Sequence, residues 1–477
     1  MKQYDAVIIG AGPAGHSCAI RIAELGGKVA IIERDYIGGI CTNWGCTPSK
    51  AMIESAKIVE EVKNCGKYGI DVRDVHIDFS KIAQRRNSVV LKTREYITDL
   101  LNHFKVDIYI GEAEILNPKS VKVKNGHFNY DTEQMVYTGE EATLNIENIV
   151  LATGSKALIP SFIDPSDTSV VSSHRLITID SLPESLTIIG GGVIGLEFAT
   201  IFSNLGSKVT IVELLPRVLG MMDTDISAEI SKIMEANSVR ILTNHKVTEL
   251  HNGILKAVNL ETNDTVEIQS ELNLVAIGRK AVLQEEQYQR LGITYHQAGI
   301  GVDDTLQTSV PGIWAIGDAT GKSILAHCGI QQGIICAENI MRGDNDPTMM
   351  NYDVVPAVVY SLPEIISVGS VPNDLTDVKT VKVPFNSNLR ANIEEHTEGF
   401  IKLWIKNNTL LAAQAIGYMV SEIQQELTNM IALQTDIHDI TKIIHAHPTY
   451  NEIIRSALEY ADGKAVDFYL PVQFKRI

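Results

Sequence analysis

The sequence predicts an α/β protein with two Rossmann-like dinucleotide-binding domains followed by a C-terminal α+β domain. Two segments repeat one βαβ pattern, and a third glycine-rich strand pattern follows at residues 308–319. From about residue 349 the chain is strand-rich, with helical patterns near 421–433 and 451–461 and no nucleotide-binding motif. The 477 residues fit about three domains, and no long linker separates them.

The repeated segments are residues 5–33 and 187–213. In each, a β-branched run leads into a glycine turn, an amphipathic helix pattern and a second strand pattern that ends in Glu, 23 residues after the first Gly. The pattern residues are Gly10, Gly12, Gly15 and Glu33 in the first segment, and Gly190, Gly192, Gly195 and Glu213 in the second. These glycines permit a tight turn, close approach to a pyrophosphate and helix–strand packing, while the Glu accepts hydrogen bonds from a ribose. We therefore expect the chain to bind two dinucleotides.

Other patterns connect the two segments to the third glycine-rich strand. Residues 51–63 and 80–104 show helical spacing, and residues 144–155 show a strand that enters a turn of small residues. The third strand ends in Gly317-Asp318, where a carboxylate is placed to meet a cofactor hydroxyl.

The clearest candidate for a reactive site is the segment of residues 38–52, GGICTNWGCTPSKAM, which contains two cysteines. Cys41 and Cys46 are five residues apart at the start of a predicted helix, where regular geometry would separate them by about 7.5 Å of rise. A bond between them requires a distorted first turn and should be easily reduced, and a helix amino terminus stabilises thiolate. This favours a redox-active pair over a zinc half-site or two inert thiols, and we expect no metal site because no second Cys/His cluster has ligand spacing.

A dithiol reaction needs a proton acceptor, and residues 445–452, HAHPTYNE, offer one. Glu452 can orient the imidazole of His447 and raise its basicity. Taken alone, a His in such a segment is more often structural, and we assign His445 to that structural class.

Composition excludes several classes of protein. The net charge of −17 argues against a nucleic-acid groove, and no apolar run is long enough to span a membrane. The amino-terminal residues resemble neither a signal nor a transit peptide, and six scattered cysteines do not form a secreted disulfide framework. The remaining cysteines, which we expect to be buried or incidental, are Cys18, Cys65, Cys328 and Cys336. We expect a cytoplasmic protein that binds neither nucleic acid nor membrane.

Together these motifs resemble the flavin-dependent pyridine nucleotide-disulfide oxidoreductases, and within them the dihydrolipoamide dehydrogenases most. The resemblance runs essentially end to end. It includes Pro48-Ser49-Lys50, Ala152-Thr153-Gly154, Gly317-Asp318, Leu325-Ala326-His327, Pro363-Glu364, Thr397-Glu398-Gly399-Phe400 and His445-Ala446-His447-Pro448-Thr449.

The resemblance implies FAD and NAD as cofactors and a homodimer. It implies an FAD-binding domain that begins with residues 1–149, an NAD-binding domain at 150–274, a central region at 275–348 that completes the FAD site, and a dimerisation domain at 349–477. The implied FAD contacts are Gly10, Gly12, Gly15, Glu33, Lys50, Thr153, Gly154, Gly317, Asp318 and Ala326. The implied NAD contacts are Gly190, Gly192, Gly195, Glu213 and Gly278.

The resemblance also implies roles in catalysis. Cys41 would exchange with substrate sulfur, and Cys46 would be the charge-transfer thiolate beside the flavin. Lys50, paired with Glu197, would lie near the reactive flavin nitrogen. His447, supported by Glu452, would be the base and would come from the partner subunit.

The implied activity is oxidation of protein-bound dihydrolipoamide with reduction of NAD. The lipoyl carrier would belong to a 2-oxo-acid dehydrogenase complex or a glycine-cleavage system. Alternatives are a related enzyme that reduces glutathione disulfide, thioredoxin or mercuric ion, and a flavin-binding structural or redox-sensing protein with little turnover. The disulfide substrate stays open because the chain departs from the family pattern at Trp44, Thr47, Ala281-Val282, Tyr450 and Asn451.

Overall fold

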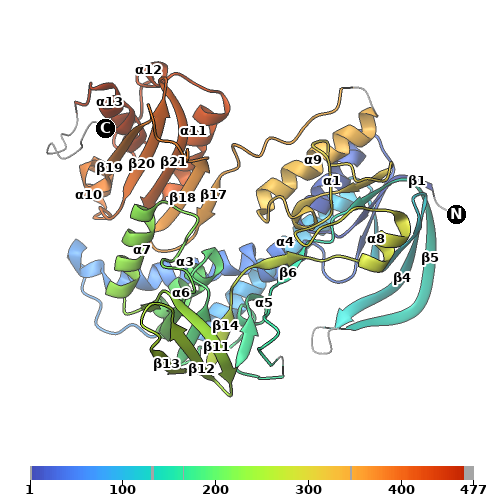
Figure 1. The fold of residues 1–477 in the computed structure, drawn as a ribbon, viewed down its shortest axis with the longest axis horizontal. Coiled ribbons are helices and arrows are strands. Elements are labelled where there is room, and N and C mark those ends of the chain that lie inside the picture. Colours follow the sequence, from blue (N-terminus) through green and yellow to red (C-terminus); the bar gives the residue numbers. More distant parts are fainter. Residues whose placement is uncertain (1–2, 130–133, 165, 344–345, 467–477) are drawn as a thin grey trace.

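The first nucleotide-binding segment forms the centre of a parallel sheet. The computed structural model describes residues 3–129, 134–164, 166–343 and 346–466 (Figure 1). The strands of this sheet are β1 (Gln3–Ile9), β2 (Val29–Glu33), β3 (Asp107–Asn117), β4 (Ser120–Asn129), β5 (Gln134–Leu151) and β16 (Ile313–Ala315). β1 lies between β2 and β5, with β3 beyond β2 and β16 beyond β5, all parallel. β4 runs antiparallel to β3 and to residues 134–145 of β5.

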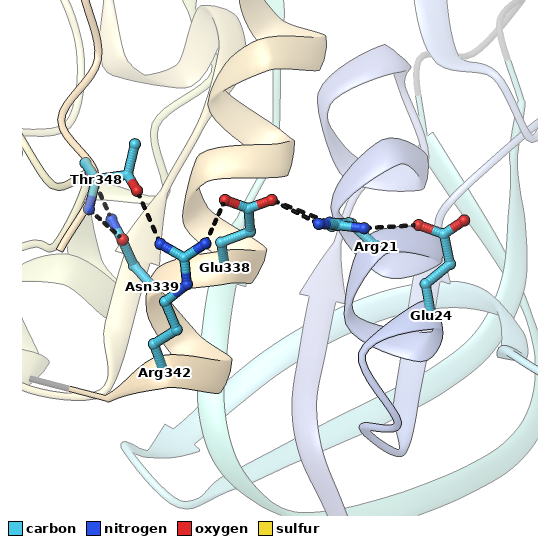
Figure 2. A network of polar contacts seen from close by, with 6 residues as sticks. All are labelled: Arg21, Glu24, Glu338, Asn339, Arg342 and Thr348. Carbon is cyan, nitrogen blue, oxygen red and sulfur yellow. Dashed lines mark hydrogen bonds and ion pairs between the residues drawn. The ribbon is translucent and has the colours of Figure 1, made fainter. Parts of the chain in front are cut away.

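Two helices far apart in sequence pack together on this sheet. α1 (Pro13–Glu24) follows the first glycine turn, and α9 (Ala326–Arg342) contacts it closely. A Cβ on Gly333 would lie 2.4 Å from the Ala14 carbonyl oxygen, so only glycine permits this approach. Figure 2 shows Glu338 of α9 between two arginines: Arg21 of α1 donates to its Oε1 at 2.7 and 3.2 Å, and Arg342 donates to its Oε2 at 3.3 Å. The central region therefore closes back onto the first nucleotide unit.

The second nucleotide segment builds an equivalent parallel sheet. Its strands, in spatial order, are β10 (Arg240–Leu242), β9 (Lys208–Val212), β8 (Ser185–Ile189), β14 (Leu272–Val275) and β7 (Val170–Ser172). An antiparallel layer follows, made of β11 (His245–His251), β12 (Ile254–Asn259) and β13 (Thr265–Gln269). The helices of this part are α5 (Ser173–Leu176), α6 (Val193–Leu205) and α7 (Thr224–Ala236). Most of α6 is buried because it packs on β8 and β9 and also against α3 (Cys46–Lys63).

A two-stranded ribbon and several helices complete these two parts of the chain. The ribbon of β6 (Ser155–Ala157) and β15 (Arg279–Ala281) is antiparallel. The remaining helices are α2 (Gly39–Trp44), α4 (Phe79–His103), α8 (Glu285–Leu291) and the 3₁₀ turns η1 (Cys65–Tyr68) and η2 (Gly317–Thr320). The strand predicted over 308–319 is shorter than expected, because after β16 the chain turns into η2 at the Gly317-Asp318 step.

The C-terminal part is an antiparallel sheet with helices, as the sequence predicted. Its strand order is β17 (Ala357–Val359), β18 (Glu364–Gly369), β21 (Thr409–Gly417), β20 (Phe400–Lys406) and β19 (Lys379–Pro384). The helices are α10 (Leu389–Ile393), α11 (Val420–Ala432), α12 (Ile437–Ile440) and α13 (Glu452–Asp462), with η3 (Phe385–Ser387). α11 packs on β18 and β21, and α13 packs on β19 and β20. Among the described residues, no helix is both long and apolar enough to cross a bilayer.

Arg86 on α4 joins the first part of the chain, which is built on the sheet of β1 to β5 and β16, to the second part, which is built on the sheet of β7 to β10 and β14. Its side chain is 2% exposed, and it donates to the carbonyl oxygens of Ile179 at 2.8 Å and Thr178 at 3.3 Å and to the Asp180 carboxylate at 3.3 Å. A buried guanidinium is tolerated only where such acceptors surround it.

We expect Arg86→Ala to lower the free energy of unfolding by about 3 kcal/mol, because two carbonyls lose their donor and a cavity remains. Urea unfolding measures this loss. Lys92→Ala is the matched control, since Lys92 is exposed on the same helix, and it should lower the free energy by about 1 kcal/mol or less. Equal losses in the two variants would contradict the role of Arg86.

Candidate active site

Gly45 separates the two cysteines by ending one helix and starting another. α2 ends at Trp44 and α3 begins at Cys46, so the predicted single helix with a distorted first turn is wrong. A Cβ on Gly45 would lie 3.2 Å from the Cα of Cys41, so a larger residue would crowd the connection. Both cysteines are free thiols in this structure. The connection therefore brings together two thiols that a continuous helix would separate.

The two thiols differ in acidity. The hydrogen bond from Cys41, helped by the Lys50 ammonium, lowers the pKa of Cys46 to about 7. The same hydrogen bond, together with burial, raises the pKa of Cys41. Near neutral pH the pair thus holds a substantial fraction of Cys46 thiolate beside a protonated Cys41.

Lys50 is held by groups from the other two parts of the chain. Its ammonium lies 2.9 Å from both carboxylate oxygens of Glu197, which is buried on α6. It also lies 4.5 Å from the ring centroid of Tyr360, whose backbone N–H donates to Glu197 at 3.1 Å. Nothing in the sequence pattern indicated Tyr360, which lies 163 residues from Glu197.

The first glycine loop is closely packed except where a ligand would approach. A Cβ on Gly10 would lie 2.2 Å from the Ala152 carbonyl oxygen, and one on Gly15 would lie 1.9 Å from the Gly10 carbonyl oxygen. A Cβ on Gly12 would meet no atom within 4 Å. The open side at Gly12 faces the amino terminus of α1, which suits a pyrophosphate.

The second glycine loop repeats this geometry. A Cβ on Gly190 would lie 2.5 Å from the Ala276 carbonyl oxygen, and one on Gly195 would lie 2.0 Å from that of Gly190. A Cβ on Gly192 would again meet no atom within 4 Å. The two loops therefore offer the same kind of site.

Each loop has a buried glutamate at the end of its second strand. Glu33 accepts from the backbone N–H of Ala11 at 2.8 Å and of Asp35 at 3.1 Å, and its burial raises its pKa. Glu213 accepts from Gly191 at 2.5 Å and from Leu215 at 2.8 Å. These bonds fix each carboxylate beside its glycine loop, where a ribose hydroxyl would meet it.

Residues from the connecting ribbon surround the Gly317-Asp318 step. The Asp318 carboxylate accepts from the Ser155 hydroxyl at 2.5 Å, and that hydroxyl accepts from Arg279 at 2.8 Å. A Cβ on Gly317 would lie 3.0 Å from the Cβ of Ala14, so this step lies against the start of α1. Asp318 therefore belongs to the neighbourhood of the first glycine loop, although the sequence separates them widely.

Thr153, Gly154 and Gly278, which are predicted to contact a cofactor, lie on turns next to the ribbon of β6 and β15. A fourth predicted contact, Ala326, begins a helix. Thr153 donates to the Val282 carbonyl oxygen at 2.9 Å, and Gly154 has a positive φ of 71°. Gly278 has a φ of 131° and directly precedes β15, and Ala326 is the first residue of α9. Each glycine loop thus has an open side of the backbone and a helix amino terminus for a pyrophosphate, and a fixed carboxylate for a ribose. The residues present therefore fit both FAD and NAD.

His447 and Glu452 form a second, separate group in the C-terminal part. The Nδ1 of His447 lies 2.8 Å from one Glu452 oxygen, and the other oxygen accepts from the Thr449 N–H at 2.8 Å. The His447 side chain is 63% exposed. Within the described chain, neither residue hydrogen-bonds to a residue of the cysteine site.

His445 is structural in its contacts, as expected. It is 8% exposed and lies 3.0 Å from a Glu426 oxygen, while Asn451 donates to the other oxygen at 2.9 Å. The described residues contain no group of three His, Cys, Asp or Glu side chains arranged to hold a metal ion.

Comparison with known families identifies the class. The family described as pyridine nucleotide-disulphide oxidoreductase matches residues 4–333, and the dimerisation domain of that family matches residues 355–458. The chain belongs to the pyridine nucleotide-disulphide oxidoreductase family.

Individual relatives are similar over nearly the whole chain. Dihydrolipoyl dehydrogenase from Geobacillus stearothermophilus is 35% identical over 97% of each protein, and that from Chlamydia pneumoniae is 33% identical over 99% of each. Among solved structures, the HOCl-induced flavoprotein disulfide reductase RclA from Escherichia coli, in its Cu(II) complex, has a TM-score of 0.83 and 26% identity, covering 96% of this chain and all of the other. LpdA from Mycobacterium tuberculosis shares the fold, with a TM-score of 0.84 at 23% identity over 97% of this chain and all of the other.

We expect Lys50→Met to raise the pKa of Cys46 from about 7 by about one unit, because the variant removes the nearby positive charge. Since the thiolate exists above this pKa, the pH midpoint for alkylation of Cys46 in the reduced protein should move upward, as read by mass spectrometry. Lys57→Met is the control, because Lys57 lies on the same helix as Lys50 but contacts Tyr418 of the C-terminal part rather than the cysteines. An unchanged midpoint in Lys50→Met would contradict the electrostatic assignment.

Proposed function

We propose that this chain is an FAD-dependent dithiol:NAD oxidoreductase that oxidises protein-bound dihydrolipoamide to lipoamide. The observation that carries the proposal is the Cys41–Cys46 thiol pair, in which interaction with Cys41 and the charge of Lys50 lower the pKa of Cys46 to about 7, beside the Lys50–Glu197 ion pair. Relatives named dihydrolipoyl dehydrogenase match almost the full length, which supports this substrate over other disulfides.

The proposed domains follow the arrangement of the nucleotide loops. Residues 1–149 begin the FAD-binding domain and 275–348 complete it, residues 150–274 bind NAD, and residues 349–477 form the interface. The residues proposed for FAD are Gly10, Gly12, Gly15, Glu33, Lys50, Thr153, Gly154, Gly317, Asp318 and Ala326; those for NAD are Gly190, Gly192, Gly195, Glu213 and Gly278. When bound, FAD supplies the path for two electrons between the cysteine pair and NAD.

The cysteines perform the exchange with substrate sulfur. In the oxidised pair, one substrate thiolate attacks Cys41 and forms a mixed disulfide, while the Cys41–Cys46 bond breaks and Cys46 leaves as a thiolate. The second substrate thiol then attacks the first substrate sulfur, which closes lipoamide and releases Cys41. The substrate loses two electrons and the cysteine pair gains them. Lys50 favours the leaving thiolate because it lowers the pKa of Cys46.

His447 is the proposed acceptor of the substrate thiol proton. The bond to Glu452 fixes the ring and stabilises the imidazolium that results. Since the exposed His447 ring lies in the part that matches the family's dimerisation domain, we propose that one subunit supplies His447 and Glu452 to the cysteines of the other in a homodimer.

The carrier of the substrate is proposed to be a lipoyl protein of a 2-oxo-acid dehydrogenase complex or a glycine-cleavage system. The proposed location is the cytoplasm, where free thiols such as the buried Cys18 and Cys336 stay reduced.

Anaerobic reduction of NAD by dihydrolipoamide tests the activity. We expect NAD reduction, with kcat/KM for NADP at least about tenfold lower because the Glu213 carboxylate repels a 2′-phosphate. Cys41→Ser should abolish dithiol turnover, whereas Cys65→Ser, remote on η1, should retain it. Faster NADH- or NADPH-dependent reduction of glutathione disulfide would favour the alternative disulfide reductase, and binding of FAD without either turnover would favour a sensing protein.

We expect His447→Gln to lower dithiol turnover by about 10²-fold while FAD stays bound, since Gln cannot accept the proton. Mixing Cys41→Ser chains with His447→Gln chains should restore activity in heterodimers, because one of the two sites then has both groups. The measurement is turnover of purified heterodimers carrying two different tags. Absence of recovery would show that His447 does not serve the other subunit.

A further inference from the structure

The chain segment between β9 and α7, residues 213–223, lies directly on the second glycine loop. It begins at Glu213, whose carboxylate accepts from the backbone N–H of Gly191 at 2.5 Å. The backbone N–H of Leu219 donates to the Gly191 carbonyl oxygen at 2.9 Å. A Cβ on Gly191 would lie 2.7 Å from the side chain of Val218, so the segment packs closely against the loop. The position of this segment therefore helps to determine the shape of the proposed NAD site.

The end of the 213–223 segment is fixed to the amino terminus of α7. Asp223 caps this helix, since its carboxylate accepts from the backbone N–H of Asp225 at 2.9 Å. The Ser227 hydroxyl on α7 donates to the Val218 carbonyl oxygen at 2.6 Å, and both residues are buried. A displacement of Asp223 would therefore reach Val218 and the glycine loop through buried contacts.

Residues of the C-terminal sheet hold Asp223 from the other side. The Lys402 ammonium on β20 lies 2.8 Å from Asp223 Oδ1 and 3.1 Å from Asp225 Oδ2. The Gln414 side chain on β21 accepts from the backbone N–H of Asp223 at 2.8 Å. Lys402 and Gln414 lie directly opposite each other on paired strands, so one position of the sheet supplies both contacts. The C-terminal part thus contacts the segment that packs on the proposed NAD site.

These contacts are largely shielded from water, so they exceed an ordinary surface ion pair in strength. The side chains of Lys402 and Asp223 are 14% and 17% exposed, and Gln414 is buried. The Asp225 carboxylate has a second partner in Lys382, whose ammonium lies at 3.2 Å. Without Lys402, one of the two ammonium groups is lost, and the carboxylates of Asp223 and Asp225 repel each other more strongly. The start of α7 and the segment before it would then be less well fixed, which weakens binding to a site that must be preformed.

We propose that Lys402 is a positioning residue for NAD, because it holds Asp223 and thereby the 213–223 segment against the second glycine loop. The inference rests on the proposed function, in which this loop and Glu213 bind NAD. Lys402 acts through Asp223 and not by contact with the dinucleotide. The affinity for NAD therefore depends on a residue of the C-terminal part, whereas the ion pair beside the cysteines has different partners.

The test is the dissociation constant of NAD for the FAD-loaded protein, measured by isothermal titration calorimetry. In Lys402→Met, we expect this constant to rise about fivefold or more, because the segment is no longer fixed at Asp223. In turnover, the KM for NAD should rise, while kcat at saturating NAD and the KM for dihydrolipoamide stay near their wild-type values. Lys402→Arg keeps the positive charge and should restore most of the affinity.

Asp223→Asn is an independent variant, since Asn also caps a helix but offers no charge to Lys402. It should weaken NAD binding, and adding Lys402→Met to it should have less effect than Lys402→Met alone. Lys406→Met is the matched control, because Lys406 lies on the same strand but donates to Thr376 rather than to α7. This control should leave the dissociation constant of NAD unchanged.

FAD content and the rate of flavin reduction by dihydrolipoamide without NAD separate positioning from a general loss of structure. Both should be as in wild type in Lys402→Met. The inference would be overturned by a wild-type dissociation constant for NAD in Lys402→Met, by an affinity in Lys402→Arg as weak as in Lys402→Met, or by an equal loss of FAD content and NAD binding. NAD binding requires no lipoyl substrate, so a wild type that binds NAD but does not oxidise dihydrolipoamide would contradict only the proposed function.

Discussion

The ion pair of Lys50 with Glu197 is the contact on which the arrangement of the site depends. It joins the first residues after the cysteines to a helix of the second part, and the backbone N–H of Tyr360 brings in the C-terminal part. A buried carboxylate is stable only with such partners, so the three parts cannot separate here without leaving Glu197 unpaired. The same ammonium lowers the pKa of Cys46, so one interaction serves both assembly and chemistry.

Local patterns allowed the prediction of the two nucleotide loops from the sequence. Gly15 packs against the Gly10 carbonyl oxygen of the same βαβ unit, and an acidic residue, Glu33, ends the second strand of that unit. The helices predicted at 421–433 and 451–461 are present as α11 and α13, because their apolar spacing suffices to define a buried face. In these elements the neighbours that decide the structure are close in sequence.

The rest could not be predicted because its partners are distant or its signal is ambiguous. Gly45 looked like part of one helix, since nothing in the spacing of Cys41 and Cys46 shows that two helices meet there. The pairing of Lys50 with Glu197 came from the family resemblance rather than from spacing. The contact of Asp223 with Lys402 spans 179 positions without a repeating pattern, and only the folded chain brings the two side chains together.

The two nucleotide loops have the same local geometry but different surroundings, and this has a consequence for how long each ligand stays. The first loop is closed by β16, η2 and α9, which come from the far end of the central region and are tied to α1 by Arg21 and Glu338. A dinucleotide bound at this loop would therefore lie beside contacts that join distant segments of the chain. The second loop lies within one continuous stretch, from β8 to β15. For the proposed assignment of FAD to the first loop and NAD to the second, this difference predicts slow release from the first site and exchange at every turnover from the second.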